Sequence, residues 1–430
     1  MDYILCNARV IDPSQNIDDI MDIGVQNGFI CAPEKIKKAE KINLKGLILT
    51  PGLIDIHVHL RQPGQGNKET IETGTKAAAA GGFTSIVAMP NTSPCADNPG
   101  TIEYIRLLSE REGVVNVLPC AAMTKNREGK EMSGIGSLKK AGTIALSDDG
   151  SCVQNHEIMR HLMEYSKSFG IPILDHCEDE ILSAGGIMHD GRWSVLLGIK
   201  GQTAASEELM VARDIILSEH TECPIHIQHV SSKGSVRMIR EAQSRGLKIS
   251  AEATPHHISL TDESMKSFDS NYKVNPPLRS EEDRLAIIEG LKDGTISVIA
   301  SDHAPHTETE KLVELDNAPF GIIGIETELS ICLEELYHSG ILSLSELISK
   351  WTIGPAKVLG LNIGTLKEGS SADITIIDVN KEVRIDKNKF YSKSRNTPFH
   401  GKKVRGQTMA TIVKGKFIFS KLNAVKGLIN

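Results

Sequence analysis

The sequence predicts an α/β protein in which a (β/α)₈, TIM-like barrel stands beside a small β-sandwich domain formed by both chain ends. The chain has 430 residues, which is too many for one simple core but suits a large barrel with a smaller domain. Its middle alternates short apolar runs with amphipathic stretches, the pattern of parallel strands joined by helices. Its two ends contain only short strand patterns separated by Gly and Asn turns.

Eight apolar runs are the expected barrel strands. Several are apolar at consecutive positions, as strands are when helices cover one face and side chains fill the other. They span about 250 residues, a usual length for such a barrel. The runs are residues 52–59, 83–90, 114–120, 143–148, 171–176, 224–230, 247–254 and 295–302. Helices are expected between them, at residues 71–80, 98–111, 155–168, 205–219, 234–245 and 281–292.

The two chain ends are expected to form one discontinuous β domain. Residues 1–50 and 360–430 would pair with each other, because chain ends often lie close together, and residues 51–359 would form the barrel. Strand patterns such as YILCNARVID near the start and ATIVKGKFIFS near the end support this division.

Composition and charge exclude several classes of function. A net charge of −7 and a pI near 6.1 argue against general affinity for nucleic acid or acidic membranes. No apolar run approaches the roughly 20 residues that span a bilayer. The start, MDYILCNARVID, has neither a basic segment nor a long apolar segment, so no secretion signal is expected. The eight cysteines form no CxxC pair, and as reduced thiols they favour a cytoplasmic location.

Polar residues fall at the ends of the predicted strands. Strand ends of a barrel converge on its carboxyl-terminal rim, where catalytic sites lie. His57 and His59 are two residues apart and therefore face the same way, and Arg61 joins them if the strand continues. The others are Asn91, Asp148 and Asp149, His176, His229 and Asp302. Imidazole and carboxylate groups gathered at one rim are typical ligands of a divalent metal such as zinc.

Each of these residues alone has a simpler interpretation. A lone His176 or His229 would usually be a hydrogen-bonded core residue, and an Asp that ends a strand usually caps a turn or helix. Coincidence on five separate strands makes that interpretation of the whole set improbable. His303 should face away from the cluster. His256 and His257 are expected either to support the ligands from outside the cluster or to pack in a loop, without binding a metal.

Seven motifs then resemble the bacterial dihydroorotases of the long, type I class, in the amidohydrolase superfamily. They are HVHLRQPG (57–64), AMPNT (88–92), SDDG (147–150), DHCED (175–179), NPPLR (275–279), SDHAPH (301–306) and APFGIIGIET (318–327). The resemblance covers nearly the whole chain. It implies zinc-dependent, reversible cyclisation of N-carbamoyl-L-aspartate to (S)-dihydroorotate and water, the third step of de novo pyrimidine (UMP) synthesis.

The resemblance also implies two zinc ions per subunit. His57, His59 and Asp302 would hold one ion, His176 and His229 the other, and Asp149 would bridge them. Related hydantoinases, dihydropyrimidinases and allantoinases generally use a carboxylated lysine as the bridge, and TIALSDDG (143–150) offers none. Strand parity leaves both Asp148 and Asp149 open as the bridge, and the resemblance favours Asp149.

Both expected substrates carry a carboxylate outside the reacting bond. The guanidinium of Arg61 suits such a group, because it can bind a carboxylate through two hydrogen bonds. By resemblance the other substrate contacts would be His59, Asn91, Asn275, His306 and the backbone of Phe320 and Gly321. From the residues alone, Asn91 could instead cap a helix and Asn275 could be a turn residue. Gln62 departs from the family, which usually has Glu there.

Asp302 is the expected catalytic residue. It would take a proton from the attacking water and deliver it to the leaving ring nitrogen. Two alternatives stay open: a hydantoinase or allantoinase acting on a related ring, and an inactive dihydroorotase-like scaffold partner of aspartate transcarbamoylase. The small-molecule substrate is the expected partner, together with a second copy in a homodimer and, as a possibility, aspartate transcarbamoylase. The polar segment 307–321 is a candidate lid.

Overall fold

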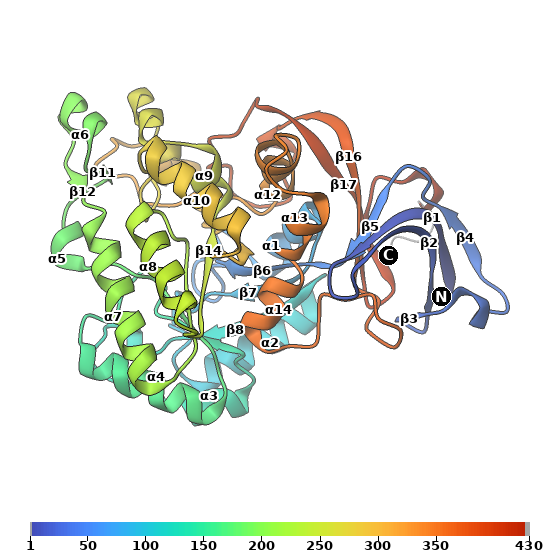
Figure 1. Cartoon of the computed structure of the whole chain (residues 1–430), viewed down its shortest axis with the longest axis horizontal. Helices are drawn as coiled ribbons and strands as arrows, with labels where there is room; N and C mark the ends of the chain where they lie inside the picture. Colours follow the sequence, from blue (N-terminus) through green and yellow to red (C-terminus); the bar gives the residue numbers. More distant parts are fainter. Residues whose placement is uncertain (1, 426–430) are drawn as a thin grey trace.

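A computed structural model describes residues 2–425 of the chain, as a barrel flanked by a separate sheet (Figure 1). The barrel sheet has eight parallel strands in the described residues, in the order β15-β14-β13-β10-β9-β8-β7-β6. Its strands are β6 (Leu53–Val58), β7 (Phe83–Ala88), β8 (Asn116–Ala121), β9 (Ala145–Leu146), β10 (Ile173–Asp175), β13 (Ile225–Ile227), β14 (Ile249–Ala253) and β15 (Val298–Ile299). Val58 pairs with His303 just after β15, and this bridge closes the barrel. The predicted barrel is confirmed.

The main helices lie between the strands, where the sequence predicts them. They are α1 (Ile71–Gly81), α2 (Pro99–Glu112), α4 (His156–Phe169), α7 (Ala205–Thr221), α8 (Lys233–Ser244) and α10 (Glu281–Asp293). Side chains of Thr70, Asn98, Asn155, Ser232 and Ser280 accept hydrogen bonds from the first backbone N–H groups of α1, α2, α4, α8 and α10, which fixes where these helices begin.

Shorter elements complete the barrel. The sequence pattern missed α3 (Ile135–Ala141), because seven residues give too few turns for a helical period. The others are α5 (Glu180–Ser183), α6 (Arg192–Leu197), α9 (Pro255–Ser259), α11 (Glu308–Lys311), α12 (Glu328–Cys332), α13 (Leu344–Ser349) and α14 (Ile353–Leu359), with a small sheet of β11 (Met188–His189) and β12 (Gly201–Gln202). Within residues 2–425, every helix is too short or too polar to span a lipid bilayer.

Strands from both ends of the chain pair into the second sheet, at the right of Figure 1. Its strands are β1 (Tyr3–Asp12), β2 (Ile17–Gln26), β3 (Phe29–Cys31), β4 (Glu40–Asn43), β5 (Ile48–Pro51), β16 (Ile374–Arg384), β17 (Lys403–Val413) and β18 (Lys416–Ser420). β16 pairs antiparallel with β5, which joins the two chain ends. The exact limits of the two domains stay a prediction.

Three threonines attach this second sheet to the barrel. Thr375 on β16 and Thr408 and Thr411 on β17 donate side-chain hydrogen bonds to the backbone carbonyls at the end of α1. All three side chains are buried. The contacts satisfy carbonyl groups that a helix end otherwise leaves without a partner.

Candidate metal centre and active site

Four histidines and two aspartates meet at the carboxyl-terminal ends of the barrel strands. They are His57, His59, Asp149, His176, His229 and Asp302, and each has at most 7% of its surface exposed. Nε2 of His59 lies 3.1 Å from Oδ1 of Asp302 and 3.3 Å from Oδ2 of Asp149. Nε2 of His57 lies 3.2 Å from Oδ1 of Asp149. The structure therefore brings together residues from distant parts of the chain.

A second group of nitrogens lies on the other side of Asp149. Nδ1 of His176 and Nε2 of His229 are 2.8 Å apart, and each is 3.6 Å from Oδ1 of Asp149. Two of the three groups of potential ligand atoms found in the described residues, each within 4.8 Å, lie here: His57, His59 and Asp149, and Asp149, His176 and His229. Asp149 is thus common to both groups, which is the position that a bridging ligand needs.

The neighbouring acid, Asp148, points elsewhere. Its carboxylate accepts hydrogen bonds from the backbone N–H of Thr124, at 3.0 Å, and from the Thr124 hydroxyl. Burial raises the pKa of Asp148 to about 6. Strand parity left the two aspartates open; in the structure Asp149, not Asp148, faces the histidines.

Hydrogen bonds outside the cluster orient the first two histidines. Nδ1–H of His57 donates to Oε1 of Glu252, at 2.6 Å, and Nδ1–H of His59 donates to Oδ1 of Asn91, at 2.8 Å. Each bond leaves Nε2 facing the cluster as a lone-pair donor. Nε2 of His57 is buried and makes no hydrogen bond. A buried, unpaired imidazole nitrogen beside carboxylates fits a metal ligand.

The electrostatics of the cluster favour added positive charge. Burial alone would lower the pKa of His57, but the carboxylates of Asp149, Glu252 and Asp302 outweigh it and raise that pKa well above its usual value. Burial would raise the pKa of Asp149, yet the surrounding histidines hold it well below its usual range. A divalent cation supplies the charge that such an arrangement stabilises.

The backbone is strained at three of these positions. Arg61, His229 and Asp302 have φ angles of 58°, 30° and 45°, in the left-handed region that non-glycine residues rarely adopt. Such strain persists where the surrounding fold enforces it, and it gathers at functional sites.

Two of the predicted substrate-binding residues, Arg61 and His306, are buried near the cluster. Arg61 is buried, its Nε donates to the carbonyl of Pro305 at 3.2 Å, and burial lowers its pKa to about 10, so it stays charged near neutral pH. Nε2 of His306 donates to the carbonyl of Phe320 at 2.8 Å, and burial lowers the pKa of His306 to about 3. His306 is therefore a neutral group beside a cationic one.

The two predicted asparagines contact protein groups around the cluster. Asn91 does not cap a helix, since Asn98 caps α2, and its side chain instead holds His59. Nδ2 of Asn275 donates to Oε2 of Glu178 at 2.8 Å. The backbone N–H of Gly321 donates to the carbonyl of Lys273 at 2.9 Å.

Comparisons with known proteins identify the family of this chain. The family model described as dihydro-orotase-like matches residues 46–235, and that of the amidohydrolase family matches residues 225–419. A protein named dihydroorotase from Acetivibrio thermocellus is 49% identical over 418 residues, 96% of this chain and 98% of the relative. Another, from Endomicrobium trichonymphae, is 50% identical over 414 residues, 96% of this chain and 98% of the relative.

The chain belongs to the dihydroorotase family. It is also similar to a solved L-hydantoinase (dihydropyrimidinase) from Arthrobacter aurescens, with 25% identity, a TM-score of 0.89, and coverage of 98% of this chain and 96% of the other. Dihydroorotases and this hydantoinase thus share one architecture.

Gln62, which differs from the family pattern, and two histidines that were not expected to bind metal make hydrogen bonds or close polar contacts within the protein. Oε1 of Gln62 accepts a hydrogen bond from the backbone N–H of Ile71, at the start of α1, at 2.9 Å. A neutral amide can make this bond as well as the carboxylate that the family usually has. Nε2 of His303 lies 3.3 Å from Glu69, and His257 bonds to Thr254 and the carbonyl of Pro276.

Four functional candidates escaped sequence reasoning. Glu252 and Glu178 contact His57 and His176, the Arg127 guanidinium donates to the backbone carbonyl of Asp149 at 2.6 Å, and Lys68 lies 3.4 Å from Nδ1 of His306. Glu252 alone had a signal, an acid within an apolar strand. Glu178 and Lys68 lie in loops and Arg127 in a three-residue 3₁₀ helix, all too short or irregular for a periodic pattern.

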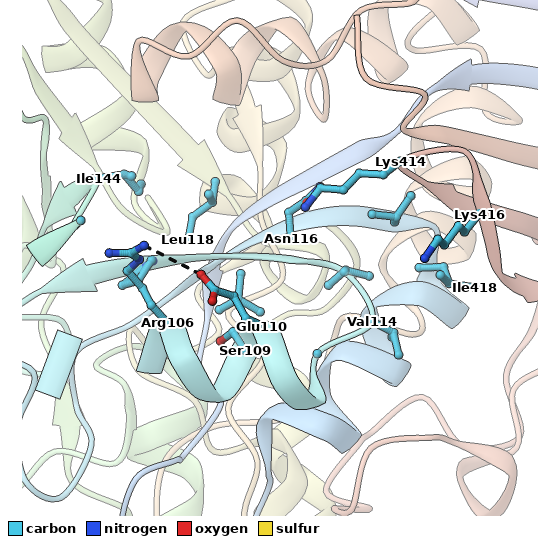
Figure 2. Close-up of a pocket in the computed structure, with 16 residues that line it drawn as sticks. Arg106, Ser109, Glu110, Val114, Asn116, Leu118, Ile144, Lys414, Lys416 and Ile418 are labelled. Carbon is cyan, nitrogen blue, oxygen red and sulfur yellow. Dashed lines mark ion pairs between the residues drawn. The ribbon is translucent and has the colours of Figure 1, made fainter. Parts of the chain in front are cut away.

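A cavity of about 630 Å³ lies away from this chemistry (Figure 2). Arg106, Asn116, Leu118, Ile144 and Lys414 are among its lining residues, so it opens at the amino-terminal ends of β8 and β9. None of the predicted site residues lines it. In this family fold, the chemistry belongs at the opposite end of the strands.

Proposed function

We propose that this protein is a dihydroorotase that interconverts N-carbamoyl-L-aspartate and (S)-dihydroorotate, in the third step of pyrimidine synthesis. Relatives with this name are nearly half identical over almost the whole chain. The observation that carries the proposal is the position of Asp149 between two groups of buried histidines, beside a buried arginine that suits a carboxylate.

Two zinc ions would be held by this cluster. His57, His59 and Asp302 would bind one ion, His176 and His229 the other, and Asp149 both; nitrogen and carboxylate donors suit zinc. When bound, such ions lower the pKa of a shared water toward neutrality and polarise the carbonyl of the ring amide.

Asp302 moves the proton in this scheme. In the hydrolytic direction its carboxylate accepts a proton from the attacking water as the new C–O bond forms. It then delivers that proton to the ring nitrogen as the C–N bond breaks, and cyclisation reverses these steps with loss of water. Its Oδ1, 3.1 Å from Nε2 of His59, lies within the cluster where the water would be held.

The remaining residues would hold the substrate. Arg61 would pair with the carboxylate that lies outside the reacting bond, with Asn91 and His306 beside it. Asn275 would contact the ring, as would the backbone of Phe320 and Gly321. His59 would serve both the metal and the substrate. These groups orient the ring so that its reacting carbonyl meets the water.

The related hydantoinase reaction is less well supported. Residues 143–150, around β9, contain no lysine that could bridge two metal ions. A ring without a carboxylate would also offer no partner for the buried guanidinium of Arg61. Assaying dihydroorotate beside hydantoin, allantoin and dihydrouracil, the same ring without the carboxylate, separates the two. Faster turnover of an uncharged ring would favour the alternative.

A chelator assay tests the proposed reaction itself. The purified protein should form dihydroorotate from carbamoyl aspartate, lose this activity after treatment with a strong chelator, and regain it with added zinc. Activity that survives complete metal removal would contradict the metal role. A folded protein that holds negligible metal as purified, and that stays inactive when zinc is added, would instead favour the scaffold alternative.

The wider setting is also proposed. A homodimer and an association with aspartate transcarbamoylase are expected from the family resemblance, and light scattering of the protein alone and mixed with that enzyme tests both. A cytoplasmic location fits the eight cysteines, all of which are free thiols in the structure.

A further inference from the structure

Glu178 lies between a proposed metal ligand, His176, and a proposed substrate contact, Asn275. It follows His176 by two residues, in the loop after β10, and 17% of its side chain is exposed. Its Oε2 accepts two hydrogen bonds, one from Nε2–H of His176 at 2.9 Å and one from Nδ2–H of Asn275 at 2.8 Å. One carboxylate oxygen thus joins two loops that are 97 residues apart.

The bond to His176 determines which ring nitrogen can bind a metal. An ionised carboxylate only accepts hydrogen bonds, so Nε2 of His176 must carry the hydrogen. Nδ1 then keeps its lone pair, and it is Nδ1 that faces His229 and Asp149. Histidines that bind metals usually donate their other N–H to such a carboxylate, which holds the ring in place.

The bond to Asn275 determines which end of its amide faces the pocket. Since the carboxylate cannot donate, the NH₂ group of Asn275 must point at Glu178. The amide oxygen is then the end left for a substrate. An oxygen in that position accepts an N–H, which both the dihydroorotate ring and the carbamoyl group of its open form provide.

The neighbours of the carboxylate suit its charged form. Oε2 of Glu178 meets two nitrogen groups, Nε2 of His176 and the amide Nδ2 of Asn275, and an ionised carboxylate can accept a hydrogen bond from each.

We propose that Glu178 is a positioning residue that sets the tautomer of His176 and the amide orientation of Asn275 together. It thereby links retention of the metal to recognition of a substrate N–H group. This inference rests on the proposed function for the identity of the substrate, but not for the effect on the metal.

Metal affinity and KM test the two halves separately. Competition with a chromogenic chelator should show that Glu178→Ala binds zinc about 10–100-fold more weakly. At saturating zinc, its KM for dihydroorotate should rise about 3–10-fold, as expected for one lost hydrogen bond. Glu178→Gln keeps an acceptor oxygen and nearly the same shape, so it should recover most of the zinc affinity.

Two further variants serve as controls. Asn275→Ala should raise KM to a similar extent and leave zinc affinity within about twofold, because it touches only the substrate side. Glu180→Ala, an exposed acid two residues along, should change neither quantity. Circular dichroism would show that each variant is folded, and Glu178→Met, which also lacks the carboxylate acceptor, carries the test if the alanine variant is not.

The outcomes distinguish the inference from the proposed function. Unchanged zinc affinity in the Glu178 variant that lacks an acceptor would overturn the role at His176. An unchanged KM of that variant for dihydroorotate, at saturating zinc, would overturn the link to Asn275. If the wild-type protein turned over neither dihydroorotate nor carbamoyl aspartate, the proposed function would fail, while chelator competition would still report on His176.

Discussion

Charged side chains at the barrel mouth are buried, whereas an ion pair of the chain-end sheet is exposed to solvent. In the sheet, Arg9 and Asp18 pair at the surface, with 44% and 40% of their side chains exposed. At the mouth, His57 and Asp149 are 0% and 3% exposed. Water already stabilises the surface pair, whereas charge taken out of water costs free energy that packing does not return. The mouth gathers several buried histidines and carboxylates in one place, which is typical of a site for binding or chemistry.

The largest effect is expected from Asp302. Asp302→Ala removes the group that moves the proton, so kcat should fall about 10²–10⁴-fold or more. The fold should persist, because the side chain serves the cluster and not the hydrophobic core. Steady-state kinetics and circular dichroism of the purified variant check both statements. A normal kcat would remove Asp302 from the mechanism.

Arg61 should affect substrate binding more than turnover. Arg61→Met keeps an unbranched stem but loses the charged hydrogen bonds, so KM for dihydroorotate should rise about 10–100-fold. Selectivity for dihydroorotate over dihydrouracil, which lacks the carboxylate, should fall by the same factor. If the selectivity held, Arg61 would not be the carboxylate partner.

A buried lysine near the mouth should make stability depend on pH. Lys311 donates to the carbonyls of Pro319 and Gly321, and burial lowers its pKa to about 7. Because the folded pKa lies below the unfolded value of about 10.4, the folded protein gains stability as the pH rises from 7 toward 10.

Thermal unfolding at pH 7 and pH 9 measures this effect. Relative to Lys311→Met, the wild type should gain about 2 kcal/mol between the two pH values. The exposed Lys357 in α14 is the matched control, and Lys357→Met should track the wild type at both pH values. Parallel behaviour of Lys311→Met and the wild type would show that Lys311 titrates as if exposed.

The smallest effect is expected from the sheet. Arg9→Ala breaks the exposed pair with Asp18 and should cost less than about 1 kcal/mol. kcat and KM should be unchanged. A larger loss of unfolding free energy would show that this exposed ion pair stabilises the fold strongly, and it would contradict the contrast between the two regions.

The sequence predicted the elements better than the contacts between them. The strand runs and six helices could be located because their periods repeat over several residues, and the histidines because each ends a run. Asp148 and Asp149 could not be separated, since a shift of one residue at a strand end exchanges their directions. Arg127 was missed because it contacts a distant part of the chain, and Glu178 because its second partner, Asn275, lies 97 residues away. No local pattern indicates such contacts.

Asp149 is proposed to join two zinc ions, and the metal content of the purified protein tests this most directly. Elemental analysis of the zinc-loaded wild type should give two equivalents of zinc per chain. His229→Ala should retain the ion held by His57, His59 and Asp302, giving one equivalent and little turnover. A wild-type protein with full turnover and no bound metal would contradict the two-metal site at the mouth.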